Sequence, residues 1–157
     1  MFFDFNVYVA CSLTNAPEEF RQMVYSFQDD LAKVCRVLRF LGLTNHSGRE
    51  TYNYDIKTCV DMADLLVGIA DFPSTGFGWE LCHQCEVKGG PAIVLAYNQA
   101  NVTKFILDPD VPDYRLVRYG NLRKEGVEIV ANKLRKMNEA RCRQLSLFAD
   151  PPLRLVG

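Results

Sequence analysis

The chain lacks a long apolar run, an excess of charge of one sign, and a dense cluster of cysteines. No apolar run approaches the roughly 20 residues that a membrane-spanning helix requires. Charged residues make up 24% of the 157 residues and the formal net charge is −1, which argues against a surface that coats nucleic acid or binds an anionic membrane. The N-terminus also lacks a basic region followed by an apolar stretch. We therefore expect a cytoplasmic protein that does not bind membranes and recognises a small ligand.

The six cysteines are spread through segments that look like strands and helices, which favours reduced thiols over a disulfide scaffold. They are Cys11, Cys35, Cys59, Cys82, Cys85 and Cys142. Cys82 and Cys85 have the C-x-x-C spacing, but no second Cys/His pair lies at a zinc-ligand spacing. We expect these two side chains to pack in a helix, and we expect no metal and no redox cofactor.

Short apolar runs alternate with amphipathic segments along the chain, a pattern typical of parallel strands connected by helices. Strands are predicted at 7–11, 37–41, 65–70, 92–97 and 116–119, and helices follow them at 18–34, 51–63, from residue 80, at 102–107 and at 122–138. The length fits a single domain. The sequence thus predicts an α/β fold, a single doubly wound, flavodoxin-like domain with about five parallel strands over residues 1–140, followed by a tail at 141–157.

Residues 71–81 form the most distinctive stretch, because a glycine-rich segment follows a buried strand and ends in a carboxylate. Gly76 and Gly78 predict a sharp turn before a helix that begins near Glu80. Ligands of open parallel sheets bind beyond the carboxyl ends of the strands, where helix N-termini present free N–H groups to anions. Ser74 and the two glycines are therefore candidates for a phosphate cradle next to Glu80.

A second polar loop follows the first strand and should lie at the same edge of the sheet. It contains Ser12 and Thr14, and Asp55 faces the same crevice if a helix begins there. Two carboxylates, Asp55 and Glu80, suit cleavage of a glycosidic bond, since one attacks the anomeric carbon while the other manages a proton. The structural alternative is that Asp55 caps a helix and Glu80 sits at a helix N-terminus.

Three segments resemble the nucleoside 2-deoxyribosyltransferase family, including its branch that hydrolyses nucleoside 5′-monophosphates. They are YVACSLT at 8–14, ADLLV at 63–67 and PSTGFGWEL at 73–81, in matching order and spacing over roughly residues 7–97. The resemblance implies that Glu80 is the nucleophile that attacks C1′ of the sugar and releases the base. Water then completes hydrolysis, whereas a second base completes transfer.

The resemblance also implies roles for other residues. Asp55 matches the family's aspartate that orients the sugar and handles a proton, with Asp61 as a weaker substitute, and Asp64 is interpreted as structural. The implied substrate-binding residues are Tyr8, Ser12, Thr14, Ser74, Gly76 and Gly78. Ser74 matches a serine of the monophosphate hydrolases, whereas Thr14 replaces an arginine of that branch. Tyr54, Phe77 and Trp79 either stack a base or pack in the interior.

The tail contains a second pattern, QLSLF at 144–148, which resembles the peptide that binds bacterial sliding clamps. The resemblance implies that Gln144 is held by hydrogen bonds while Leu145, Leu147 and Phe148 supply apolar anchors. The alternative is that these apolar side chains pack on their own domain or on a second copy of the chain.

The leading hypothesis is an enzyme that cleaves the N-glycosidic bond of a (deoxy)nucleoside or its 5′-monophosphate without a cofactor. Base exchange by a deoxyribosyltransferase is the nearest alternative. A nucleotide-binding sensor or adaptor without turnover is the alternative from another class of protein. A phosphoribohydrolase of the lysine-decarboxylase-like group is less favoured, because its double-glycine signature is absent. A homo-oligomer is expected from the family resemblance alone.

Overall fold

The computed structural model describes residues 1–43, 45–107 and 109–148, with Leu147 and Phe148 described by their backbone only. The strands are β1 (Asn6–Cys11), β2 (Arg36–Leu38), β3 (Leu65–Ile69), β4 (Ala92–Tyr97) and β5 (Tyr114–Tyr119). The α-helices are α1 (Glu18–Leu31), α2 (Gly48–Tyr54), α3 (Thr75–Cys82), α4 (Lys104–Leu107) and α5 (Val127–Phe148). Three π-helical segments adjoin them, η1 (Asp55–Val60), η2 (His83–Val87) and η3 (Leu122–Gly126).

The five strands form one parallel sheet in the order β2-β1-β3-β4-β5, which confirms the predicted doubly wound, flavodoxin-like fold. Strand β1 lies between β2 and β3, with Tyr8 opposite Leu66 of β3. The direction of chain progression reverses at β1 and β3, and loops at such a reversal open a crevice at the carboxyl edge of a sheet.

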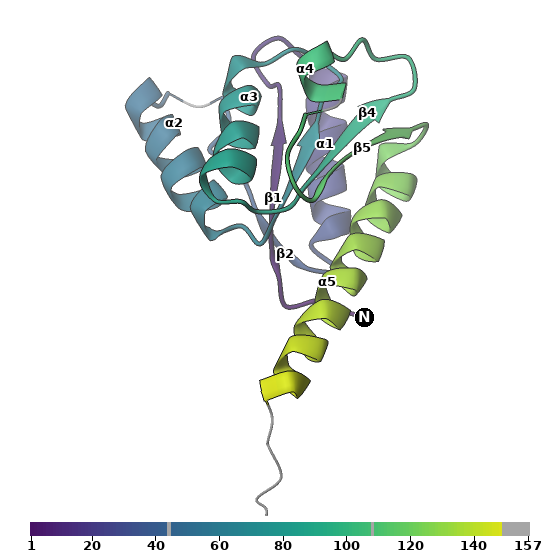
Figure 1. Cartoon of the computed structure of the whole chain (residues 1–157). Helices are drawn as coiled ribbons and strands as arrows, with labels where there is room; N and C mark the ends of the chain where they lie inside the picture. Colours follow the sequence, from purple (N-terminus) through teal and green to yellow (C-terminus); the bar gives the residue numbers. More distant parts are fainter. Residues whose placement is uncertain (44, 108, 149–157) are drawn as a thin grey trace, which may run out of the picture.

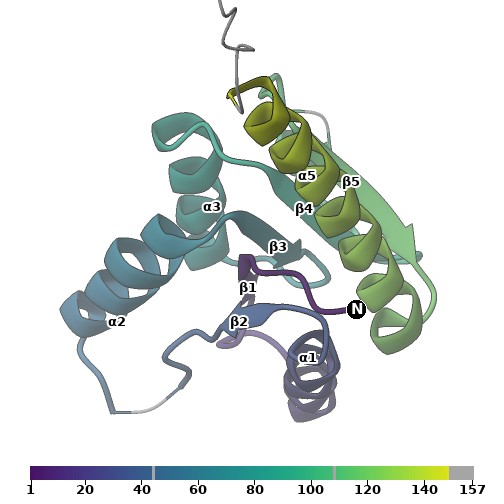
Figure 2. The same cartoon turned by 90° about the horizontal axis from the view of Figure 1, so that it is seen from below.

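Helices cover both faces of the sheet. Helices α1 and α5 lie on one face, while α2 and α3 lie side by side on the other (Figures 1 and 2). Side chains of β1 alternate between the two cores, so Val7 and Val9 face the α1 and α5 side while Tyr8 and Ala10 face the α2 and α3 side. This alternation follows from the two-residue period of a strand.

Helix α3 begins at Thr75, so the prediction that it begins near Glu80 is wrong by about one turn. Ser74 caps it, because the Ser74 hydroxyl oxygen accepts a 3.2 Å hydrogen bond from the Phe77 amide. Gly76 and Gly78 therefore lie inside the helix, and Glu80 lies in its second turn. A serine cap stabilises a helix start enough to tolerate glycines in the first turns.

The helix before β3 also begins earlier than predicted, at Gly48, where Ser47 and Glu50 form a capping box. Asp55 is the first residue of η1 and follows the end of α2, and its side chain caps the start of neither segment. It lies where α2 passes into η1, with its side chain buried. The structural alternative for Asp55 is therefore wrong, and its position in the middle of a helical segment directs it inward.

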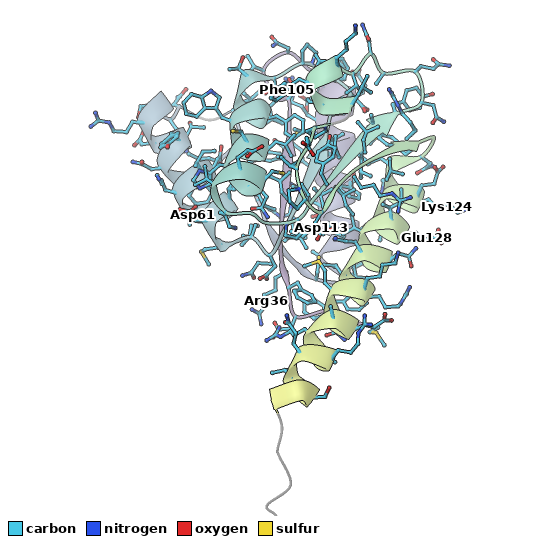
Figure 3. The ribbon with its side chains drawn as sticks, in the orientation of Figure 1. Arg36, Asp61, Phe105, Asp113, Lys124 and Glu128 are labelled. Carbon is cyan, nitrogen blue, oxygen red and sulfur yellow. The ribbon has the colours of Figure 1, made fainter. Side chains whose placement is uncertain are left out.

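The last helix is longer than predicted. Residues 122–126 form η3, and α5 then continues past residue 138 to Phe148, beyond the end of the sheet (Figure 1). Lys124 of η3 and Glu128 of α5 project from their outer side (Figure 3), as expected for a solvated charged face. The segment predicted as a tail from residue 141 is thus helical as far as Phe148.

Among the residues that the structure describes, no helix combines the length and apolar character that crossing a lipid bilayer requires. The same residues contain no group of three or more His, Cys, Asp or Glu side chains arranged to hold a metal ion. All six cysteines are free thiols.

Candidate active site

The loops after β1 and β3 meet at the carboxyl edge of the sheet, as the sequence predicted from parallel topology. The Ser12 hydroxyl donates a 3.2 Å hydrogen bond to the carbonyl oxygen of Pro73, which joins the two loops directly. Ser12 itself is buried, with 1% of its surface exposed. Its hydroxyl therefore holds the two loops together.

Glu80 and Tyr8 form a buried pair below these loops. The Tyr8 hydroxyl donates a 2.8 Å hydrogen bond to Oε1 of Glu80. Tyr8 is fully buried in β1, and only 8% of Glu80 is exposed. A buried phenol requires a hydrogen-bond partner, and the carboxylate supplies it. Glu80 therefore presents only a small part of its surface to solvent.

The pKa of Glu80 is raised to about 8, chiefly by burial; the Tyr8 hydrogen bond lowers it, and the nearby charge of Asp55 adds to the rise. The Tyr8 hydrogen bond favours the ionised form because it stabilises negative charge on the carboxylate. Such a strong shift on a carboxylate at a sheet edge is characteristic of functional sites.

Asp55 is the second carboxylate of the site. Burial raises its pKa, and a 2.9 Å hydrogen bond from the Leu41 amide to its Oδ1 acts in the opposite direction. Its charge acts on both Glu80 and Tyr8. The structure therefore brings together three of the predicted residues, Tyr8, Asp55 and Glu80, from β1, η1 and α3.

The remaining predicted substrate-binding residues surround the first turn of α3 and the loop after β1. Ser74 accepts the capping hydrogen bond but keeps its own O–H for a further partner. Gly76 and Gly78 are exposed in the first turns of α3, and Thr14 is exposed in the turn after β1. Arg21 supports that turn from below, since its Nη1 donates to the carbonyl oxygens of Leu13 and Ala16 at 3.1 and 3.0 Å.

The other two aspartates have structural roles. Asp61 lies 2.6 Å from Nε2 of His83 and is part of the surface. Asp64 accepts a 2.7 Å hydrogen bond from the Asn6 amide at the start of β1. The interpretation of Asp64 as structural matches this contact. Asp61 faces His83 rather than Glu80, so it does not substitute for Asp55.

The three aromatic candidates occupy different environments. Phe77 is buried and packs directly against Gly68 of β3, where an added Cβ would lie 2.3 Å from Cε2 of Phe77. Phe77 is therefore a packing residue. Tyr54 is half-exposed on α2, whereas Trp79 is 63% exposed and forms an edge-to-face pair with Tyr52. Tyr52 is not distinctive in sequence, because only the packing of α2 beside α3 brings it to Trp79.

A cavity of about 430 Å³ lies on the other side of α3, between this helix and the segment that carries α4. Leu81, Cys85 and Ile106 are among its lining residues, and Glu86 is its one carboxylate among the residues that the structure describes. Phe105, labelled in Figure 3, marks its side formed by α4. Two predicted substrate-binding residues, Ser74 and Gly78, also line this cavity, whereas Glu80 and Asp55 do not. We base the chemistry on the paired carboxylates.

The order and direction of the strands place this chain among the flavodoxin-like α/β proteins. No protein-family model and no curated protein sequence matches it. A conserved protein from Enterococcus faecalis V583, known from its crystal structure, is similar with 14% identity and a TM-score of 0.51, over 85% of this chain and 99% of that chain. An NAD(P)H:quinone oxidoreductase from Methanothermobacter marburgensis aligns with 11% identity and a TM-score of 0.38, over 85% of this chain and 99% of that chain. The first similarity supports the fold, and neither assigns an activity.

Proposed function

We propose that this protein cleaves the N-glycosidic bond of a (deoxy)nucleoside or its 5′-monophosphate, with Glu80 as the nucleophile. The observation that carries the proposal is the buried Tyr8–Glu80 hydrogen bond with Asp55 nearby, at the crevice where ligands of this fold bind. The family resemblance of residues 8–14, 63–67 and 73–81 supports the same reaction.

In the first step, a carboxylate oxygen of Glu80 attacks C1′ of the sugar and forms a covalent ester. The bond between C1′ and the base nitrogen breaks, and its electron pair leaves with the base. Asp55 supplies a proton to the departing base, a role that its raised pKa favours. Tyr8 holds Oε1 of Glu80 and stabilises its negative charge before attack.

In the second step, water attacks C1′ and releases Glu80 as a carboxylate. The ionised Asp55 accepts the proton of that water, which restores both groups. If a second base attacks C1′ instead, the reaction is a transfer and a new nucleoside forms. Both reactions share the covalent intermediate, and they differ only in the acceptor.

Ser74 supports a phosphorylated substrate, because it lies at the N-terminus of α3 with a hydroxyl free to donate. Helix N-termini favour anions. Thr14 adds a second exposed hydroxyl but no positive charge. A monophosphate is thus our preferred substrate class over the unphosphorylated nucleoside.

Incubation of the protein with a panel of nucleosides and 5′-monophosphates, with and without a free acceptor base, tests the proposal. We expect chromatography to show free base without an acceptor, and no base release by Glu80→Ala. Products that require an acceptor identify a deoxyribosyltransferase. Nucleotide binding without turnover of any substrate would overturn the catalytic proposal and favour a sensor or adaptor.

We also propose a cytoplasmic location and a homo-oligomeric assembly. The six free thiols suit a reducing compartment such as the cytoplasm. The family resemblance supports a homo-oligomer, and light scattering during size-exclusion chromatography tests it.

A sliding clamp is a further proposed partner. Gln144 and Leu145 are exposed on the projecting end of α5, which suits binding of a sliding clamp. The side chains of Leu147 and Phe148 lie outside the described residues. Binding of a purified clamp that is lost on deletion of residues 144–148 would support this partner.

A further inference from the structure

The exposed aromatic pair beside the carboxylates has no role in the chemistry above. Trp79 and Tyr52 face each other across α3 and α2, with ring centroids 6.4 Å apart and ring planes at 82°. Their exposed fractions are 63% and 40%, although large aromatic side chains usually bury most of their surface. If the two rings only packed α2 against α3, a larger fraction of their surface would be buried.

The pair lies next to the two carboxylates in both helices. Trp79 immediately precedes Glu80 in α3, and Tyr52 precedes Asp55 by three residues, which places it one helical turn away on the same side. Helices α2 and α3 both begin at the carboxyl edge of the sheet and run side by side away from it (Figures 1 and 2). The pair is therefore closer to that edge than the carboxylates are, on the side from which a ligand arrives.

The ring geometry leaves aromatic surface free. In an edge-to-face pair, one ring directs its edge at the other, so both faces of the first ring and the far face of the second carry no aromatic partner. A flat heteroaromatic ring can stack on such a face, and a nucleobase is the flat part of the proposed substrate. Stacking on an aromatic side chain tolerates different bases because every base has a π face.

We propose that Trp79 and Tyr52 form the platform that binds the nucleobase of the substrate, while the sugar extends from it toward Glu80 and Asp55. This inference rests on the proposed function for the identity of the ligand. It assigns recognition of the base to stacking, so the site accepts more than one base. The departing base is held on the platform as the bond to C1′ breaks.

The chain contains a single tryptophan and seven tyrosines, so fluorescence excited at a wavelength that tyrosine does not absorb reports on Trp79 alone. We expect a nucleoside, a 5′-monophosphate and a free base each to quench this emission in a saturable way, and 2-deoxyribose 5-phosphate to leave it unchanged. The Glu80→Gln variant keeps the carboxylate's shape and should show the same quenching without turnover. Calorimetric binding of a nucleotide with unchanged emission would overturn the platform.

Variants separate stacking from packing. Trp79→Leu keeps apolar volume but removes the π face, and we expect the dissociation constant for the nucleotide, measured by calorimetry, to rise about tenfold or more. Trp79→Phe should restore most of the affinity, and Tyr52→Leu should weaken binding less than Trp79→Leu does. For Trp79→Leu in the active enzyme, KM should rise while kcat stays nearly constant.

The two proposals fail in different ways. Quenching by bases without turnover of any substrate would overturn the glycosidase and leave the platform standing. Turnover that is insensitive to Trp79→Leu, with equal affinity for the nucleotide, would overturn the platform and leave the glycosidase standing. Circular dichroism shows whether Trp79→Leu is folded. If Trp79→Leu loses affinity because it is unfolded, and Trp79→Phe does not restore the affinity, the result also counts against stacking.

Discussion

The Tyr8 hydroxyl donates a 2.8 Å hydrogen bond to Oε1 of Glu80 across 72 positions of sequence. Tyr8 belongs to β1 and Glu80 to the second turn of α3, and both are buried. The phenol supplies the hydrogen bond that opposes the effect of burial on the carboxylate. We therefore expect Tyr8 to position the proposed nucleophile, in addition to its predicted contact with the substrate.

Removal of this hydroxyl should impair the reaction while preserving the fold. A hydrogen bond to a charged group is worth about 1.5–3 kcal/mol, so Tyr8→Phe should lower kcat/KM about ten- to hundredfold. The ring stays in the core, and far-UV circular dichroism should match the wild-type protein. Unchanged kcat/KM in Tyr8→Phe would contradict a positioning role.

The pH dependence of the reaction should report the ionisation of Glu80. Attack on C1′ requires the carboxylate, and its pKa in the free protein is about 8. Because the proposed mechanism also requires a protonated Asp55, kcat/KM should depend on two groups of the free enzyme, and the limb of the profile near pH 8 should belong to Glu80. Tyr8→Phe removes a hydrogen bond that lowers the pKa of Glu80, so this limb should move to higher pH. A profile with no limb near pH 8, or one that Tyr8→Phe leaves in place, would contradict this ionisation of Glu80.

Asp55 and Asp61 form a matched pair of variants, because they are the same residue type six positions apart on the same helical segment. Asp55→Asn should lower kcat/KM by about 100-fold or more, the usual contribution of a general acid or base. Asp61→Asn changes a contact to His83 only, so its kcat/KM should stay close to the wild-type value. Equal losses in the two variants, measured in one assay, would remove Asp55 from the mechanism.

Glu80 should also make stability depend on pH. Its pKa is about 8 in the folded protein and 4.5 for an unperturbed glutamate, so the unfolded chain loses this proton first as pH rises. The free energy of unfolding therefore falls as pH rises from about 4.5 through 8. Glu80→Gln removes this decline while keeping the acceptor for Tyr8.

Thermal unfolding of the two proteins across that pH range measures the difference. Glu80→Gln should have a melting temperature close to that of the wild type near pH 4.5 and a higher one near pH 9, at about the two ends of the transition. Glu19→Gln, at an exposed position of α1, controls for a lost negative charge. A constant difference at every pH would show that burial of Glu80 does not perturb its ionisation.

Gly68 of β3 and Gly78 of α3 should respond in opposite directions to alanine. An added Cβ at Gly68 would collide with the ring of Phe77, so Gly68→Ala should lower the free energy of unfolding by about 1–3 kcal/mol. At Gly78, nothing lies within 4 Å of an added Cβ. Gly78→Ala should therefore raise the free energy of unfolding by about 0.5–1 kcal/mol, because alanine is favoured over glycine within a helix. Urea denaturation measures both.

The activity of Gly78→Ala then tests the binding role proposed for that glycine. If the substrate approaches the backbone of α3 closely, the more stable variant should have a higher KM. If the KM of the stabilised variant is unchanged, Gly78 does not contact the substrate.

The strands and their order were predictable, because apolar runs bounded by turn residues need only local information. Strand β4 occurs at the predicted residues 92–97, and β5 begins two residues earlier than predicted. The start of α3 was not predicted, since Gly76 and Gly78 suggest a turn unless the cap at Ser74 is given more weight. The extension of α5 was also missed, because its last turns have no apolar stripe packed on the sheet.

By itself, the sequence determined a parallel α/β sheet and the presence of Glu80 after β3, because strand burial and chain order are written in local patterns. The tertiary structure decided which side chains meet. Tyr8 reaches Glu80 only because β1 pairs with β3 in a particular register, and Asp55 faces both because η1 turns it inward. Tyr52 reaches Trp79 only because α2 packs beside α3. Contacts between residues distant in sequence, and the burial that raises the pKa of Glu80, depend on packing that no local pattern encodes.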